Sequence, residues 1–133
     1  SSAASDVYKR QPGDVVVKLY MEAERQLNRA SYYIPLKNYE ETNKALIKAQ
    51  DVINALRSCL DMKIPVSKNL DSLYEYFNRE IVEANIKKDK AKVDALLPMI
   101  GELREAFAEI NSMSREQMEA QEKAAQSAMQ EQA

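Results

Sequence analysis

The stretch NLDSLYEYFNREIVEAN at residues 69–85 decides the fold class, because its apolar residues recur at helical spacing. Apolar positions three or four residues apart fall on one face of an α-helix. That face carries Leu70, Leu73, Tyr74, Phe77, Ile81 and Ala84. The stretch therefore predicts an amphipathic helix that packs its apolar face against other helices.

Three further stretches show the same period, at residues 16–34, 38–62 and 90–110. Asn38, followed three positions later by Glu41, resembles a capping box and predicts the start of the second helix. The apolar residues of that helix cover a wide arc, which indicates contact with two neighbouring helices. The chain thus predicts four helices of several turns each.

Breakers and caps predict the remaining boundaries. Residues 63–68 include a proline and predict a loop, with Asn69 as the N-cap of the third helix. Pro98 and Gly101 interrupt the fourth helix, but its apolar positions resume in phase, so we expect a kink rather than an end. Ser114 is a candidate cap for one more helical segment.

Composition supports an all-α protein, because the 133 residues include only two glycines and four prolines. Helices joined by short connections pack with their neighbours antiparallel, which predicts an up-down four-helix bundle. We assign the bundle to residues 12–113 and a polar C-terminal tail, either helical or mobile, to residues 114–133. The tail is rich in Gln, Glu and Ala and has little apolar surface to bury.

The first eleven residues, SSAASDVYKRQ, resemble the in-frame translation of a transposase adapter used to prepare sequencing libraries. We therefore expect residues 1–11 to be an artefact and exclude them from the fold, as for a tag or fusion scar. On this interpretation the genuine sequence starts near Pro12 and the native N-terminus is missing.

Charge and hydropathy narrow the class of partner. The net charge is −2 and both signs are interspersed, so the sequence gives no electrostatic reason to expect nucleic acid. No apolar run approaches the roughly 20 residues that span a bilayer, so we expect no membrane insertion. A cytoplasmic location is the resulting expectation.

The residues that most enzymes of helical-bundle type need are absent from the sequence. It contains no histidine, which general acid-base catalysis and di-iron bundles favour, and a single cysteine, Cys59. Cys59 falls on an apolar helical arc without a histidine base, so we expect it to pack rather than react. We predict a protein that is not an enzyme and uses no cofactor or metal.

Apolar residues that the core faces do not use are the best candidates for a binding function. They are Ile47, Tyr76, Val82 and Ile86, with Val52 and Cys59 at the edge of the core. We expect them to line grooves that accept amphipathic segments of a partner, although scattered exposed apolar residues are also normal on proteins. Asn85 lies beside an apolar stripe and is expected to hydrogen-bond backbone across such a groove.

Two stretches carry a family resemblance: LIKAQDVINALRSCLD at residues 46–61, and NLDSLYEYF with the later triplet EAN within residues 69–85. They resemble the flagellar secretion chaperone family FliS, and the resemblance extends from Pro12 to about Ile110. It implies the same four-helix bundle. It also adds Lys48 and Tyr74, which lie in matched motifs, to the candidate partner-binding residues.

The resemblance implies a protein that holds newly made flagellin in the cytoplasm by binding its disordered C-terminal segment. Such a protein prevents premature polymerisation and delivers flagellin to the flagellar export gate, and it needs no nucleotide or metal. The alternative that stays open is a non-enzymatic helical-bundle module that self-associates, with a weak homodimer as its simplest form.

Overall fold

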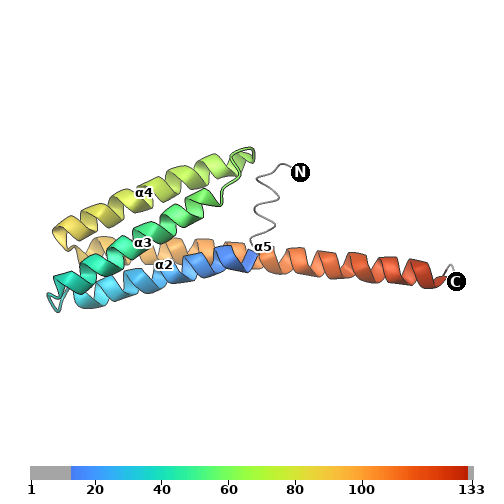
Figure 1. Cartoon of the computed structure of the whole chain (residues 1–133), viewed down its shortest axis with the longest axis horizontal. Coiled ribbons are helices and arrows are strands. Elements are labelled where there is room, and N and C mark those ends of the chain that lie inside the picture. The colour runs from blue at the N-terminus through green and yellow to red at the C-terminus, as the bar shows by residue number, and fades with distance from the viewer. Residues whose placement is uncertain (1–12, 132–133) are drawn as a thin grey trace.

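The computed structural model describes residues 13–131, which form four α-helices (Figure 1). The helices are α2 (Gly13–Tyr33), α3 (Tyr39–Ser58), α4 (Pro65–Lys87) and α5 (Lys90–Glu131). The all-α prediction is therefore confirmed. Residues 1–11, expected to derive from an adapter, lie outside the described residues, so that expectation stays a prediction.

Each helix packs against its two neighbours around the bundle. α2 contacts α3 and α5 most extensively, while α4 contacts α3 and, less extensively, α5. Short connections at residues 34–38, 59–64 and 88–89 reverse the chain, so successive helices run antiparallel (Figure 1). This arrangement confirms the predicted up-down four-helix bundle.

The core lies between the four helices and consists of aliphatic, alanine and aromatic side chains. Inside it, the hydroxyl groups of Tyr20 and Tyr74 hydrogen-bond to each other, which pairs two polar groups that burial would otherwise penalise. Phe107 of α5 stacks on Tyr20 with the ring centroids 5.5 Å apart. These aromatic contacts tie α2, α4 and α5 together at the end of the bundle from which α5 projects.

The start of α3 agrees with the boundary predicted from the sequence, and its end does not. The backbone N–H of Glu41 donates to the Asn38 side-chain oxygen at 3.3 Å, which confirms the predicted N-cap. The helix ends at Ser58 instead of residue 62. The N–H groups of Cys59 and Leu60 bond to carbonyls three residues back, and this tight turn closes the helix early.

α4 begins four residues before the predicted N-cap, Asn69, which lies exposed inside the helix. Proline suits a first helical position because its φ angle is already helical and its missing N–H needs no partner there. Pro65 occupies that position, preceded by Ile64 in extended conformation. The loop therefore spans residues 59–64, and the prediction that it reaches residue 68 was wrong.

α5 runs without interruption from Lys90 to Glu131. It does not end at Pro98, as predicted, and this proline lies on the exposed side of the helix. Ser114 does not start a new helical segment; it lies within the same helix. Every described residue from 112 to 131 is exposed, and this part of α5 extends beyond the bundle (Figure 1).

The connection between α4 and α5 is a tight turn with a left-handed residue. Lys88 has a φ of 51°, and its N–H bonds to the Ala84 carbonyl, which caps the end of α4.

None of the helices within residues 13–131 combines the length and apolarity needed to cross a lipid bilayer.

Candidate functional site

Two asparagine pairs fix how α3 and α4 face each other. The Asn85 amide donates to the Asn43 side-chain oxygen at 2.7 Å, and the Asn78 amide donates to the Asn54 oxygen at 2.9 Å. Because the helices run antiparallel, residues later in α3 lie opposite residues earlier in α4. The two pairs therefore show the register between α3 and α4.

Ile47 and Val82 lie between these asparagine pairs. Ile47 is about one helical turn after Asn43, and Val82 is about one turn before Asn85, so both side chains lie along the contact between α3 and α4. They are 46% and 41% exposed, and Ile86, one turn beyond Val82, is 77% exposed. We call Ile47, Val82, Asn85 and Ile86 the α3–α4 face.

Amide groups give this face hydrogen-bonding capacity beside its apolar side chains. The Lys88 ammonium donates to the Asn85 oxygen, and burial lowers the pKa of Lys88. The Asn78 side-chain oxygen is buried and accepts no hydrogen bond from the described residues. Asn85 thus bonds across the α3–α4 contact to a side chain, Asn43, rather than to the backbone that the sequence suggested.

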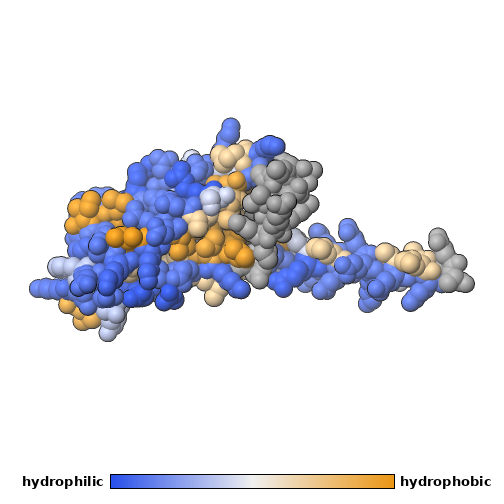
Figure 2. Space-filling view, viewed as in Figure 1, coloured by the Kyte–Doolittle hydropathy of each residue, from blue (hydrophilic) through white to orange (hydrophobic). Residues whose placement is uncertain are grey.

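The molecular surface shows where apolar side chains are concentrated (Figure 2). In Figure 2 an apolar patch lies over the C-terminal end of α4, where Val82 and Ile86 are exposed. A second apolar area lies near the end of the bundle from which α5 projects. Most of the surface between these two areas is hydrophilic.

Lys48 and Val52 lie on the edge of α3 that faces α2, away from the α3–α4 face. Lys48 lies close enough to Glu22 of α2 for its charge to help lower the pKa of that carboxyl. Glu41, two turns before Lys48, pairs with Arg29 of α2 at 3.2 Å, so this edge of α3 faces α2. Val52, one turn after Lys48, is half-buried. The structure does not bring these two residues together with Ile47.

The two tyrosines of the candidate set are also separated from the α3–α4 face. Tyr74 is 1% exposed, so it is a core residue, and its assignment to a partner-binding surface is corrected. Tyr76 is exposed on the other edge of α4, one turn before Glu80, which pairs with Lys92 of α5 at 3.3 Å. Tyr76 therefore borders α5 rather than α3.

Cys59 lines a pocket of about 240 Å³ at the end of the bundle, which we call the end pocket. Its wall is mainly apolar and combines the α3–α4 loop with residues from α4 and α5. The lining residues are Cys59, Leu60, Asp61, Ile64, Val66, Ser67, Leu70, Phe107 and Ile110. The sequence predicted only Cys59 of this group as a binding residue, although Ile64 and Val66, two apolar residues that flank Pro65 within the predicted loop, were a usable signal.

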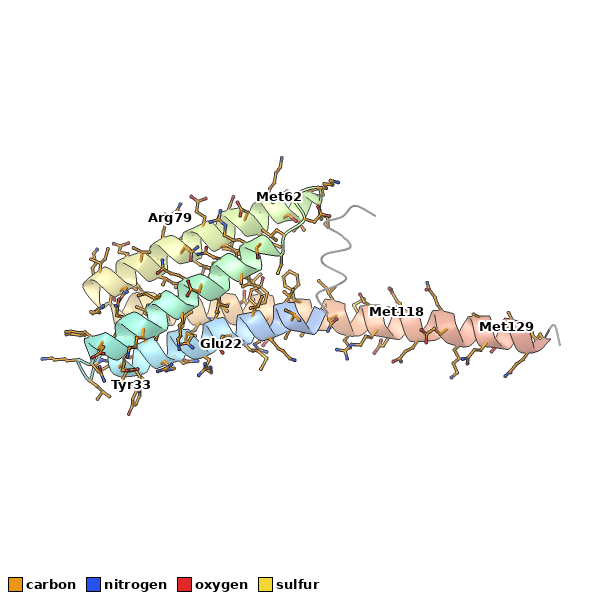
Figure 3. The ribbon with its side chains drawn as sticks, in the orientation of Figure 1. Glu22, Tyr33, Met62, Arg79, Met118 and Met129 are labelled. Atoms are coloured by element: carbon orange, nitrogen blue, oxygen red, sulfur yellow. The ribbon has the colours of Figure 1, made fainter. Side chains whose placement is uncertain are left out.

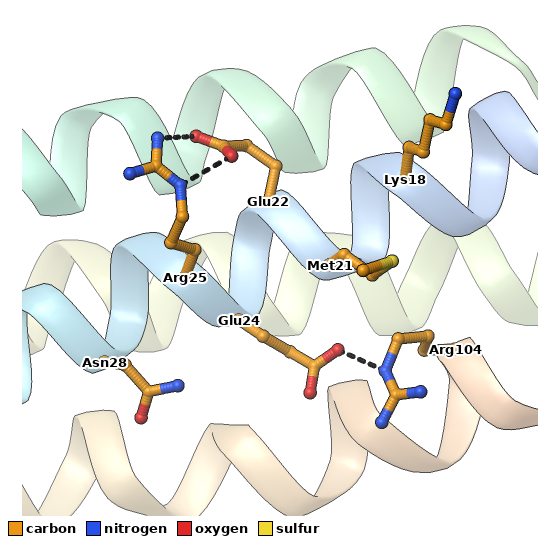
Figure 4. Close-up of a pocket in the computed structure, with 7 residues that line it drawn as sticks. All are labelled: Lys18, Met21, Glu22, Glu24, Arg25, Asn28 and Arg104. Atoms are coloured by element: carbon orange, nitrogen blue, oxygen red, sulfur yellow. Dashed lines mark hydrogen bonds and ion pairs between the residues drawn. The ribbon is translucent and has the colours of Figure 1, made fainter.

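An open groove lies between α2 and α5, and most of the residues that line it are charged (Figure 4). Glu22 pairs with Arg25 at 2.8 Å, and Arg104 of α5 pairs with Glu24 of α2 at 2.5 Å. Hydrogen bonds from Arg25 and Gln26 lower the pKa of Glu22 to about 2. The charges of this groove largely compensate one another, so it offers an apolar partner less than the α3–α4 face does.

The side chains of the α3–α4 face and the end pocket suit the binding of a partner. Burial raises the pKa of the Cys59 thiol, which keeps it protonated and weakly nucleophilic near neutral pH. No cluster of His, Cys, Asp and Glu within residues 13–131 has an arrangement that could hold a metal ion. The α3–α4 face and the end pocket instead offer apolar contact and amide hydrogen bonds.

Comparison with known proteins assigns the chain to a family. The profile of the family described as flagellar protein FliS matches residues 2–114. The flagellar secretion chaperone FliS of Vibrio cholerae is 32% identical over 111 residues, which cover 82% of each chain. The protein of the same name from Bacillus subtilis is 30% identical over 96 residues, or 72% of each chain. The chain therefore belongs to the FliS family of flagellar secretion chaperones.

Proposed function

We propose that this protein is a cytoplasmic export chaperone that binds the disordered C-terminal segment of flagellin. In this role it prevents premature polymerisation and delivers flagellin to the flagellar export gate. The observation that supports binding most directly is the α3–α4 face, where Ile47, Val82 and Ile86 remain exposed beside side-chain amide groups. Membership of the FliS family supports the identity of the client.

The spacing of the apolar residues suits a helical partner. Val82 and Ile86 are one turn apart on α4, and Ile47 lies across the α3–α4 contact from them. An amphipathic segment with apolar residues at i, i+3 or i+4, and i+7 can cover all three side chains. A segment that is disordered when free folds on contact, and its apolar groups are then unavailable for filament packing.

The end pocket provides a second attachment point for the same segment. Val66 in the pocket and Ile86 on the α3–α4 face lie at opposite ends of α4, about 30 Å apart at 1.5 Å per residue. A partner that reaches both must extend along the bundle. A long flexible segment meets this requirement better than a compact domain does.

The proposal is tested by calorimetric titration of the protein with a peptide covering about forty C-terminal residues of the flagellin from the same source, a length that the family resemblance suggests and that suits coupled folding and binding. We expect saturable one-to-one binding with a negative heat-capacity change. Ile47→Asp should weaken binding by roughly tenfold or more, because the carboxylate must be desolvated under the bound segment.

Met21→Asp is the matched control, because Met21 is similarly exposed but lies in the charged groove between α2 and α5. It should bind flagellin as the unmodified protein does. Equal weakening by both variants, with helical content intact, would remove the α3–α4 face from the proposal. No binding by the unmodified protein would contradict the function itself.

A further inference from the structure

We propose that residues 115–131 of α5 form a lid, which folds back at a hinge over residues 111–114 and closes the end pocket of the same chain. The structure shows the extended form, in which every described residue from 112 to 131 is exposed. A helix of this length without packing is only marginally stable in water. Closure of the lid needs no partner; only its effect on flagellin binding rests on the proposed function.

The hinge residues suit a reversal of the chain. Asn111, Ser112 and Ser114 are weak helix formers, because their side chains hydrogen-bond to nearby backbone in turns. Ser114, followed three positions later by Gln117, also forms a capping-box signal for the start of a helix. The extended helix makes no use of this signal, since Ser114 lies inside it. A lid that starts its own helix at Ser114 does use it.

The end pocket is an apolar opening directly beside the hinge. Phe107 and Ile110 line the pocket and are the last apolar residues of α5 before the hinge. Ile64, Val66 and Ile110, which also line it, are each about half exposed. Covering such apolar surface is favourable. The lid is the neighbouring segment that has nothing else to pack against.

Apolar residues continue from the end pocket along α4 and α5, and we call them the α4–α5 strip. They are Leu73, Tyr76, Met99 and Leu103. The two on α5 lie on the side of the helix that carries Lys92 and Ile110, because they are seven residues, or about two turns, from them. Tyr76 lies one turn before Glu80, which pairs with Lys92 at 3.3 Å, so Tyr76 is level with about residue 96 of α5. The α3–α4 face leaves this tyrosine unused.

The apolar residues of the lid match the span from the end pocket to Tyr76. Met118 and Met129 are exposed on the projecting part of α5 (Figure 3). They lie on one side of the helix, about 16–17 Å apart at 1.5 Å per residue. A reversal centred on the hinge places Met118 level with about Phe107 and Met129 level with about residue 96. Met118 then enters the end pocket, and Met129 lies beside Tyr76.

Closure competes with a partner for the end pocket. Docking buries two methionine side chains, which adapt to irregular apolar surfaces, but it interrupts α5 at the hinge. The extended and closed forms are therefore close in free energy. Under the proposed function, flagellin uses the end pocket as a second attachment point and displaces the lid, so the lid covers this pocket only while it is empty.

Disulfide formation with Cys59 tests closure in the full chain. Cys59 is the sole cysteine of the sequence and lines the end pocket. In the extended form, residue 118 lies about 12 Å along the helix beyond Ile110, too far from the pocket for a disulfide. Copper phenanthroline oxidation of dilute protein should close an intramolecular disulfide in Met118→Cys several times faster than in Ala120→Cys. Residue 120 is the matched control, because it is exposed on the opposite side of the same helix.

Free-thiol labelling and mass spectrometry of the single chain measure these rates. Faster closure at residue 118 would support a lid whose methionine side faces the pocket. Equal rates at the two positions, or no intramolecular disulfide at either, would overturn the proposal.

The oxidised Met118→Cys protein then tests the effect on binding, because its lid is locked over the end pocket. It should bind the flagellin peptide roughly tenfold or more weakly than the same protein after reduction. Equal affinities of the oxidised and reduced forms would refute competition between lid and client. Absence of binding by the unmodified protein would instead contradict the proposed function, and the disulfide rates alone would then decide whether the lid closes.

Discussion

The inner half of α5, residues 90–110, and its projecting half, residues 111–131, belong to one continuous helix in two different environments. The inner half buries Val93, Leu96 and Ile100 against the other helices. The projecting half is exposed and rich in Ala, Glu and Gln, which are strong helix formers. Local propensity thus favours helix in both halves. Packing against α2 and α4 stabilises only the inner half.

The largest expected contrast comes from truncating one apolar side chain in each half. Ile100→Ala should lower the free energy of unfolding by about 2–5 kcal/mol, because it leaves a cavity in the core. Met118→Ala should change it by less than about 0.5 kcal/mol, because Met118 is exposed. Urea denaturation at low protein concentration measures both. Similar losses in the two variants would mean that the projecting half packs on the bundle.

Glycine substitution compares local helix stability in the two halves. Ala95 and Ala125 are both exposed on α5, and glycine is intrinsically about 1 kcal/mol less favourable in each position. Ala95→Gly should lower the free energy of global unfolding by about that amount, because the inner half unfolds with the bundle. Ala125→Gly should instead speed local hydrogen exchange in residues 111–131.

Hydrogen exchange with mass spectrometry, combined with urea denaturation, separates these two effects. The urea midpoint of Ala125→Gly should equal that of the unmodified protein. A lower midpoint would contradict independent unfolding of the projecting half.

The smallest expected effect is on pH dependence. Hydrogen bonds from Lys90 and Ser31 lower the pKa of Asp94 in the inner half. A carboxyl with a lowered folded-state pKa stabilises the protein above its unfolded pKa, near 3.8, and this contribution is lost as the pH falls through the folded value. Asp94→Asn should therefore reduce stability near neutral pH and make little difference in strong acid.

Glu119→Gln in the projecting half provides the comparison for Asp94. Thermal unfolding at neutral pH should show a smaller loss of stability for this variant than for Asp94→Asn, because Glu119 is exposed and lies outside the bundle. A pH-independent loss in Asp94→Asn would show that the carboxylate charge is not what stabilises this site.

The sequence predicted much of the fold because helical period and caps are local. The Asn38 cap and the buried stripes of all four helices could be placed from residues a few positions apart. The end of α3 and the start of α4 were misplaced, because Pro65 and Asn69 are both acceptable helix starts within one turn of each other. The tertiary structure selects between such neighbouring signals.

Only part of the candidate site could be predicted from the sequence. The exposed positions of Ile47, Val82 and Ile86 followed from their angles outside the core stripes. Tyr74 lies on a core stripe and is buried, with its hydroxyl bonded to that of Tyr20, so the helical period placed it correctly and the family resemblance did not. The end pocket combines residues far apart in sequence, which no local pattern can bring together.

By itself, the sequence determined that this chain forms amphipathic helices, where most of them begin, and which family motifs they carry, because these properties depend on residues within one or two turns. Only the tertiary structure decided that Ile47 and Val82 lie along the same contact between α3 and α4 and that Lys48 faces α2 instead. It also decided that α5 leaves the bundle as a single helix. Lateral register depends on side chains meeting across helices, and one helix's own period does not specify that.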